Sequence, residues 1–213
     1  MENRNITVTL SKAKEWFNSG NATLKEIALQ AFDKDELTYN FKNITTFKKA
    51  CEALNLDYML CLSNICNIAI ISKASAAMFK LNIIRKALNL GQDLHLTKDP
   101  KNYCIYYPYN PFVTKSSIYY NSNINSGKME VIGKIKSEGE EYNVLGGDAY
   151  NGGTTSLGRF DSDNGVGYAN THIGLLGCAN KEIAQHLGKY FGMLITEAKY
   201  GDMVDFEIIE AAH

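Results

Sequence analysis

The stretch that decides the fold is KASAAMFKLNIIRKALNL, residues 73–90. Apolar residues recur in it at intervals of three and four, which is the spacing of an α-helical face. One apolar stripe consists of Ala74, Ala77, Met78, Leu81 and Leu88, and a second, on the opposite side, of Ala76, Phe79, Ile83, Ala87 and Leu90. A helix that is apolar on both sides is buried between layers. The stretch therefore predicts a central helix that ends at Gly91.

Three shorter helices are predicted before the central one. The first covers residues 12–19 and stops at the turn around Gly20. The second begins at a capping box formed by Thr23 and Glu26, and the third covers residues 46–54. The apolar stripe of the second helix is Leu24, Ile27, Ala28, Ala31 and Phe32, and that of the third is Phe47, Ala50, Cys51 and Leu54.

The character of the chain changes after Gly91. Strands are predicted at residues 103–107, 117–120, 128–135, 142–145, 171–176 and 204–209. A last helix follows Asn180, which is a suitable N-cap. Helices that precede a mixed region indicate the α+β class. We expect a helical region at residues 1–91 and an α+β region at 103–213, with 92–102 as the candidate boundary, although one continuous domain fits equally well.

The last helix has two sides. Its apolar arc consists of Ile183, Ala184, Leu187, Tyr190, Phe191, Leu194, Ile195 and Ala198, and its polar side of Glu182, Gln185, His186, Lys189 and Thr196. Gly188 and Gly192 make a G-x-x-x-G spacing at the flanks of the apolar arc. We expect these glycines to let another backbone pack closely, within the subunit or between subunits.

Bulk composition excludes several classes of protein. The net charge of −1 over 213 residues argues against a dedicated nucleic-acid binder. The five cysteines are scattered and odd in number, which fits folding in a reducing cytoplasm better than a disulfide framework. The first ten residues lack the apolar core of a secretory signal, and no run of 18 uncharged apolar residues predicts a membrane span.

Catalytic and metal motifs are weak. Residues 161–165, DSDNG, suggest a calcium loop, but Gly is fifth in it and the twelfth position is His172. Cys61 and Cys66 are too far apart for the usual zinc knuckle. No nucleophile elbow, zinc-protease motif or phosphate loop is present in the sequence. We therefore expect a protein that is not an enzyme and needs no cofactor.

Tyrosines and glycines are the most informative residues for function. Five tyrosines fall within fifteen positions, and a Gly-rich segment, residues 146–170, follows with Asn, Ser, Thr and Asp. Tyrosine gives rigid contact area at low entropic cost, and small polar residues adapt around it. Long irregular segments inside a compact domain are usually functional or disordered. The candidate binding residues are Tyr106, Tyr107, Tyr109, Tyr119, Tyr120, Tyr150, Asn151, Asp161, Asp163 and Asn164. The alternative is that many of these rings simply cover the core.

Several segments together resemble a family of uncharacterised proteins from Bacteroidales phages and prophages, including crAss-like phages. They are LSKAKEWFNSGN at 10–21, TLKEIALQAF at 23–32, IRKALN at 84–89, YYPY at 106–109 and KEIAQHLGKYF at 181–191. The chain departs from the family at the tyrosine run, which often carries a Trp, and in the last helix. The resemblance implies a phage protein but transfers no catalytic residue.

The expected function is therefore that of a phage virion structural protein, such as a head fibre, a capsid decoration or a tail accessory component. It would be made in the host cytoplasm, reside in the virion and contact other virion proteins, and we expect it to form a homo-oligomer. No nucleic acid or membrane is expected as a partner. The alternative is a receptor-binding module that stacks its tyrosines on a cell-surface glycan and hydrogen-bonds sugar hydroxyls through Asp161, Asp163 and Asn164.

Overall fold

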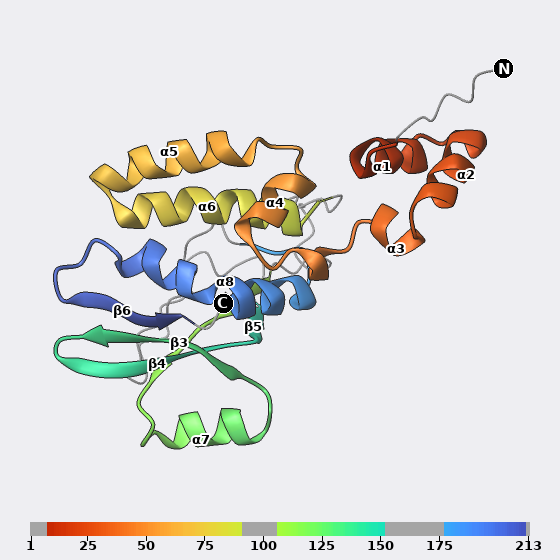
Figure 1. Cartoon of the computed structure of the whole chain (residues 1–213). Coiled ribbons are helices and arrows are strands. Elements are labelled where there is room, and N and C mark those ends of the chain that lie inside the picture. Colours follow the sequence, from red (N-terminus) through yellow and green to blue (C-terminus); the bar gives the residue numbers. More distant parts are fainter. Residues whose placement is uncertain (1–7, 91–105, 152–176, 212–213) are drawn as a thin grey trace, which may run out of the picture. The chain divides into compact units, whose positions relative to one another are not determined.

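The computed structural model describes residues 8–90, 106–151 and 177–211 (Figure 1). Helices and two antiparallel sheets make up these residues, so the predicted α+β class is confirmed. The chain divides into two compact units, Met1–Asn40 and Phe41–His213. This division lies earlier in the chain than the candidate boundary at 92–102, because helices on both sides of that segment share one core in the second unit.

The first unit contains α1 (Leu10–Asn18), α2 (Ala22–Ala31) and α3 (Lys34–Leu37) around a small apolar cluster. The predicted capping box of α2 is wrong. Asn21 is the N-cap, because its Oδ1 accepts hydrogen bonds from the backbone N–H groups of Thr23 and Leu24 at 3.0 and 3.2 Å. A capping box exists at Asp33 and Glu36 instead, at the start of α3.

The predicted apolar stripe of α2 is only partly buried. Ala28 is its one fully covered residue, Ile27 is exposed, and Phe32 is half-buried at the end of the helix. A unit of three short helices has too little surface to cover a complete helical face.

The helices of the second unit's N-terminal part are η1 (Phe41–Asn43), α4 (Phe47–Ala53), α5 (Tyr58–Ile71) and α6 (Lys73–Leu88). Ser72 ends α5 and caps α6, since its Oγ accepts a hydrogen bond from the backbone N–H of Ser75. Asp202 holds this corner by accepting hydrogen bonds from the Ser72 hydroxyl and from the Ala74 N–H. Helix α6 packs against α4 and α5 on one side and against α8 (Lys181–Tyr200) on the other, which confirms the predicted central helix (Figure 1).

Two antiparallel sheets pack against the side of α8 that faces away from α6. The first has four strands in the order β2 (Phe112–Val113), β4 (Glu140–Gly146), β3 (Glu130–Ser137) and β6 (Phe206–Ala211). The second is a ribbon of β1 (Tyr106–Tyr109) and β5 (Asp148–Asn151). The predicted strands at 128–135, 142–145 and 204–209 correspond to β3, β4 and β6, whereas the one predicted at 171–176 lies outside the described residues.

Two strand predictions need correction. The run of β residues at 117–120 lies at the start of a helix, α7 (Ile118–Asn125), because Tyr120 and Ile124, one helical turn apart, both pack on the buried Met129 cluster. The strand expected to stop before Pro108 continues through it to Tyr109. A short ribbon tolerates proline because an edge position needs no N–H donor on its open side.

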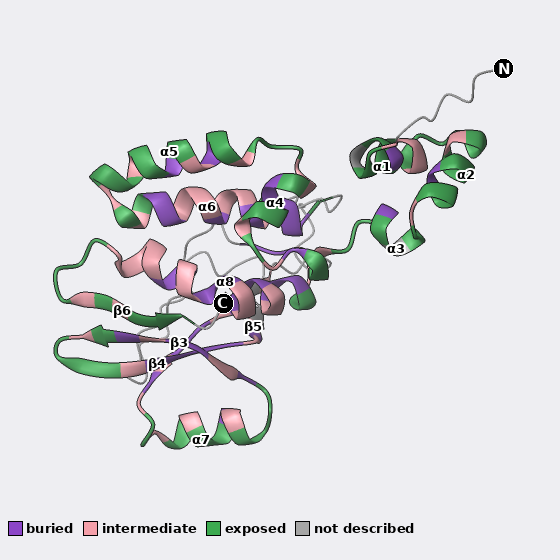
Figure 2. Cartoon of the chain, viewed as in Figure 1, coloured by how far each residue is buried: buried purple, intermediate pink, exposed green. Residues whose placement is uncertain are grey.

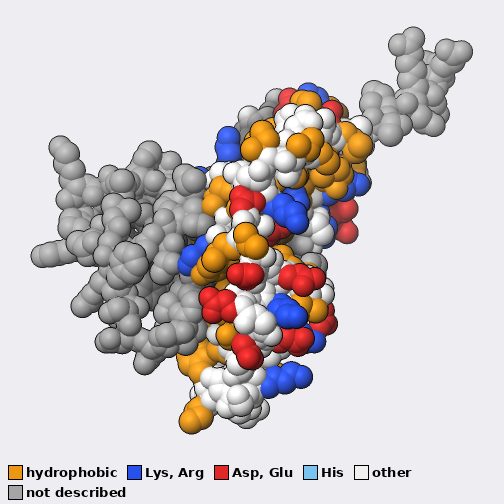
Figure 3. All heavy atoms as spheres, turned by 90° about the vertical axis from the view of Figure 1, so that its left-hand side faces the viewer, with side chains coloured by type: hydrophobic (Ala, Val, Ile, Leu, Met, Phe, Trp, Pro, Cys, Tyr) orange, Lys and Arg blue, Asp and Glu red, His pale blue; other side chains and the backbone are white. Residues whose placement is uncertain are grey.

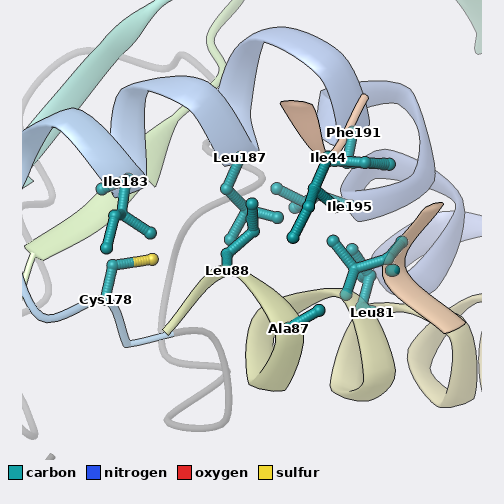
Figure 4. Close-up of a cluster of buried hydrophobic side chains, with 12 residues drawn as sticks. Ile44, Leu81, Ala87, Leu88, Cys178, Ile183, Leu187, Phe191 and Ile195 are labelled. Atoms are coloured by element: carbon teal, nitrogen blue, oxygen red, sulfur yellow. The ribbon is translucent and has the colours of Figure 1, made fainter. Parts of the chain in front are cut away.

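Helix α8 carries the main core. Asn180 is its N-cap, as predicted, with Oδ1 accepting from the Ile183 N–H at 2.9 Å. Leu187, Phe191 and Ile195 of α8 face Leu81 and Leu88 of α6 (Figure 4). The buried residues of the second unit concentrate on these two helices and on the strands (Figure 2). Thr196, expected on the polar side, is fully buried, and its hydroxyl donates to the Gly192 carbonyl at 2.9 Å.

The two glycines of α8 allow a close approach, as predicted, and the partner is within the subunit. A Cβ on Gly192 would lie 2.5 Å from Nδ2 of Asn110 and 2.3 Å from Cδ1 of Ile132, and one on Gly188 would lie 3.0 Å from Cβ of Pro108. Asn110 is fully buried at this contact and donates hydrogen bonds through Nδ2 to the carbonyls of Leu145 (3.0 Å) and Gly188 (2.8 Å). This amide therefore fastens α8 to strand β4.

Candidate functional site

The β1–β5 ribbon brings together five of the ten predicted binding residues. Its Cα register pairs Tyr106 with Asn151, Tyr107 with Tyr150, and Tyr109 with Asp148. The two strands come from segments about forty residues apart in the chain. The predicted tyrosine run and the start of the predicted Gly-rich segment are thus one structural element.

Gly147 connects this ribbon to the larger sheet. Its φ of +104° is a backbone conformation that other residues rarely adopt, and it lies between the end of β4 and the start of β5. The prediction of an irregular segment from residue 146 is wrong for its first part, because residues 148–151 form β5. Residues 152–170, with Asp161, Asp163 and Asn164, lie outside the described residues, as does His172.

A second group of predicted residues gathers around an ion pair at one end of the ribbon. The ammonium group of Lys128 lies 2.9 Å from a carboxylate oxygen of Asp148, and Asp148 is the register partner of Tyr109. Of the two tyrosines on α7, Tyr119 is close enough to Lys128 to contribute to the raised pKa of that ammonium group, and Tyr120 packs on the same apolar cluster as Tyr109. We call the group Tyr109, Tyr119, Tyr120, Lys128 and Asp148 the tyrosine patch.

Burial within the tyrosine patch differs from ring to ring. Tyr109 and Tyr120 are half-buried and pack on a cluster whose buried members are Val113, Met129 and Leu145. Tyr119 is 38% exposed. Tyr106, elsewhere on the ribbon, packs partly against the main core. The interpretation that many tyrosines cover the core therefore holds for Tyr106, Tyr109 and Tyr120, and Tyr119 is the ring available at the surface.

Electrostatics fix the ion pair within this patch. The hydrogen bond to Asp148, and then the attraction of its carboxylate, raise the pKa of Lys128 above its usual value, and Tyr119 adds a smaller contribution. The side chain of Asp148 is largely buried, while that of Lys128 is more than half exposed. Asp148 also accepts a hydrogen bond from the Ala149 N–H at 2.8 Å. The carboxylate is thus held in place, and the ammonium group lies at the surface beside Tyr119.

Sequence reasoning did not find Lys128 or Asp148. Each follows a glycine with positive φ, Gly127 and Gly147, but such positions are common in turns. Only the strand register places the two charges together. No local signal in the sequence predicts that pairing.

Several other reactive side chains of the described residues, among them His186, Cys51 and Cys178, are half-buried or buried in inert surroundings. His186 was predicted on a polar side of α8, but its Nε2 lies 2.8 Å from the Ile44 carbonyl oxygen and its ring packs against Phe41 and Tyr190. Burial lowers the pKa of His186, so its neutral form is favoured.

Three of the four described thiols, Cys51, Cys61 and Cys178, are also buried, whereas Cys66 is exposed on α5. Burial raises the pKa of Cys178 to about 12 and that of Cys51 to about 11, and a thiol of such high pKa is a poor nucleophile. Over residues 8–90, 106–151 and 177–211, no three His, Cys, Asp or Glu side chains are grouped as a metal site would require. In the same residues, no helix is both long and apolar enough to cross a membrane.

Comparison with known proteins identifies no relative of this chain. No protein-family model, no curated protein and no solved structure matches the chain.

Proposed function

We propose that the chain is a non-enzymatic structural component of a phage particle, and that it works by protein–protein contact through the tyrosine patch. The observation that supports this most directly is the exposed ring of Tyr119 beside the Lys128–Asp148 ion pair. Aromatic rings at the centre of a patch with charged groups around them are typical of protein contact surfaces.

The patch is suited to binding because much of it is already ordered. Tyr109 and Tyr120 are held against buried Met129 and Leu145, and Asp148 is held by Lys128 and by the backbone. A partner that docks here would order few additional side chains, which lowers the entropic cost of association. The assignment to a phage particle rests on the family resemblance of the sequence.

Tyr119→Ala is expected to reduce incorporation of the chain into phage particles at least about tenfold, which corresponds to the loss of one contact residue of moderate strength. The measurement is the amount of chain per purified particle, by quantitative mass spectrometry, in a host that supplies either wild-type or variant protein. Tyr39→Ala is the matched control, since Tyr39 is 42% exposed and lies in the first unit. Wild-type chain absent from purified particles would refute the proposal.

A glycan-binding function is the second candidate. An exposed tyrosine ring next to a carboxylate and an ammonium group is also suited to a sugar, which stacks on the ring and hydrogen-bonds to the charges. Saturation-transfer NMR of the purified chain with glycans of the host surface tests this function. This candidate would be favoured over the first if the glycan signals disappear in Tyr119→Ala while the amount of chain per purified particle is the same for Tyr119→Ala and the wild type.

A further inference from the structure

Helix α5 carries a large apolar surface that the rest of the described chain leaves uncovered. Met59 and Leu60 near its start are 69% and 62% exposed, and Ile70 and Ile71 at its end are 84% and 89% exposed. Figure 3 shows hydrophobic side chains gathered at the height of α5 and α6, with charged side chains concentrated below them. Monomeric proteins rarely leave contiguous apolar surface of this kind uncovered.

The exposed residues occupy one side of the helix. At 100° per residue all of them except Ala69 fall within an arc of roughly 160°. The arc consists of Met59, Leu60, Ser63, Asn64, Cys66, Asn67, Ile70 and Ile71. The opposite side contains the buried Cys61 and Ile65 and faces α6, which packs against α5. We call this arc the outer face of α5.

The outer face contains no charged residue, and its pattern is symmetric about Ile65. The apolar pair Met59–Leu60 lies as far before Ile65 as the pair Ile70–Ile71 lies after it, and small or amide side chains fill the middle. Charges appear just beyond both ends, with Asp57 eight residues before Ile65 and Lys73 eight residues after it. Both Asp57 and Lys73 are exposed.

Such a pattern is complementary to itself when reversed. In two antiparallel copies that cross at the level of Ile65, the Met59–Leu60 pair of each meets the Ile70–Ile71 pair of the other, because the matching positions lie within about 20° of each other around the helix. A two-fold contact uses the same patch on both subunits and needs this self-complementarity.

We propose that the outer face of α5 binds a second copy of this chain, with the two α5 helices antiparallel around a two-fold axis that passes between them at the level of Ile65. The contact is separate from the tyrosine patch, because Figure 1 shows α5 and α7 at opposite ends of the second unit. The chain can therefore pair with itself while the patch stays available to another protein.

Sedimentation equilibrium of the purified full chain tests the surface. The wild type is expected to dimerise, and Ile71→Glu is expected to raise the dissociation constant at least about a hundredfold, because the substitution enters a two-fold contact twice. Ile118→Glu is the matched control, since Ile118 is 87% exposed but lies on α7. A wild type that stays monomeric, or a dimer as stable in Ile71→Glu as in Ile118→Glu, would overturn the proposal.

Disulfide trapping tests the antiparallel direction, in a chain whose Cys66 and Cys104 are replaced by Ser. Met59→Cys with Ile70→Cys is expected to give a covalent dimer on mild oxidation, because the two positions meet across the axis. Either substitution alone is expected to give none, since copies of one position lie roughly 15–18 Å apart along the antiparallel helices, and a disulfide requires Cα atoms within about 7 Å. Efficient trapping by a single substitution would refute the antiparallel arrangement.

The outcomes separate this inference from the proposed function. Loss of dimerisation in Ile71→Glu with the Tyr119 contact intact supports two independent surfaces. A monomeric wild type that still enters particles would overturn the α5 contact and leave the proposed function in place.

Discussion

Replacing Phe191 by Ala is expected to lower the free energy of unfolding by about 3–5 kcal/mol. Phe191 is buried at the centre of α8 and shares a core cluster with Leu81 and Ile84 of α6 and with Leu187 and Ile195 of its own helix (Figure 4). Removing the ring loses its transfer free energy and leaves a cavity, because two packed helices cannot close over the gap completely.

Urea denaturation followed by circular dichroism measures this effect. The control is Ile118→Ala, which removes apolar atoms from a side chain that is already largely exposed and is expected to change stability by less than about 0.5 kcal/mol. A loss below about 1 kcal/mol in Phe191→Ala would show that the α6–α8 contact does not form the core of the second unit.

Phe32 shows where the same reasoning from sequence fails. Phe32 and Phe191 both belong to an apolar stripe at helical spacing, and sequence alone predicts equal burial for them. Phe32 is half-buried because α2 has only two short helices beside it, whereas α8 lies between α6 and the strands. Periodicity identifies which side of a helix is apolar, but the amount of burial depends on what the fold places against that side.

The central helix and the last helix could be predicted because their signals are local. The double stripe of α6, the Asn180 cap and the close-packing glycines of α8 are all properties of neighbouring residues. Helix α7 could not be predicted from the sequence. Its first residues favour strands, and its stability depends on Tyr120 and Ile124 packing on Met129.

In the candidate site, too, the features with a local sequence signal could be predicted and those that depend on tertiary packing could not. Composition pointed to the tyrosines, and the structure shows Tyr119 exposed while Tyr109 and Tyr120 are partly covered. The ion pair of Lys128 and Asp148 joins residues twenty positions apart through strand register, which no local pattern contains. Likewise, apolar runs were considered only as possible membrane spans, and the exposed apolar face of α5 was not predicted, because its exposure depends on which of its sides α6 occupies.

Asn110→Asp is expected to destabilise the protein by at least about 3 kcal/mol at pH 7, although the two side chains have nearly the same shape. Nδ2 of Asn110 donates to two carbonyl oxygens, those of Leu145 and Gly188. A carboxylate in this place has no hydrogen to donate and would face both oxygens with a negative charge. Gly192 lies against the same amide and leaves no room for the side chain to move away.

The loss from Asn110→Asp should depend on pH, and its sign follows from linkage. Burial against two carbonyl oxygens raises the pKa of the introduced carboxyl in the folded state above its unfolded value of about 3.9. Below about pH 3 the carboxyl is neutral in both states and can donate one hydrogen bond, so the penalty is smallest there. As pH rises, the unfolded state ionises first, and stability falls by about 1.4 kcal/mol per pH unit until the folded pKa is reached.

Denaturation of Asn110→Asp between pH 4 and pH 8 measures this dependence against two controls. Asn110→Ala removes the same two hydrogen bonds without adding a charge, so its loss relative to wild type should not vary with pH. Asn121→Asp introduces a carboxyl at an exposed position of α7 and should change stability little at any pH. If Asn110→Asp and Asn110→Ala lose the same stability at every pH, the amide does not face the two carbonyls, and α8 must be fastened to β4 by apolar packing alone.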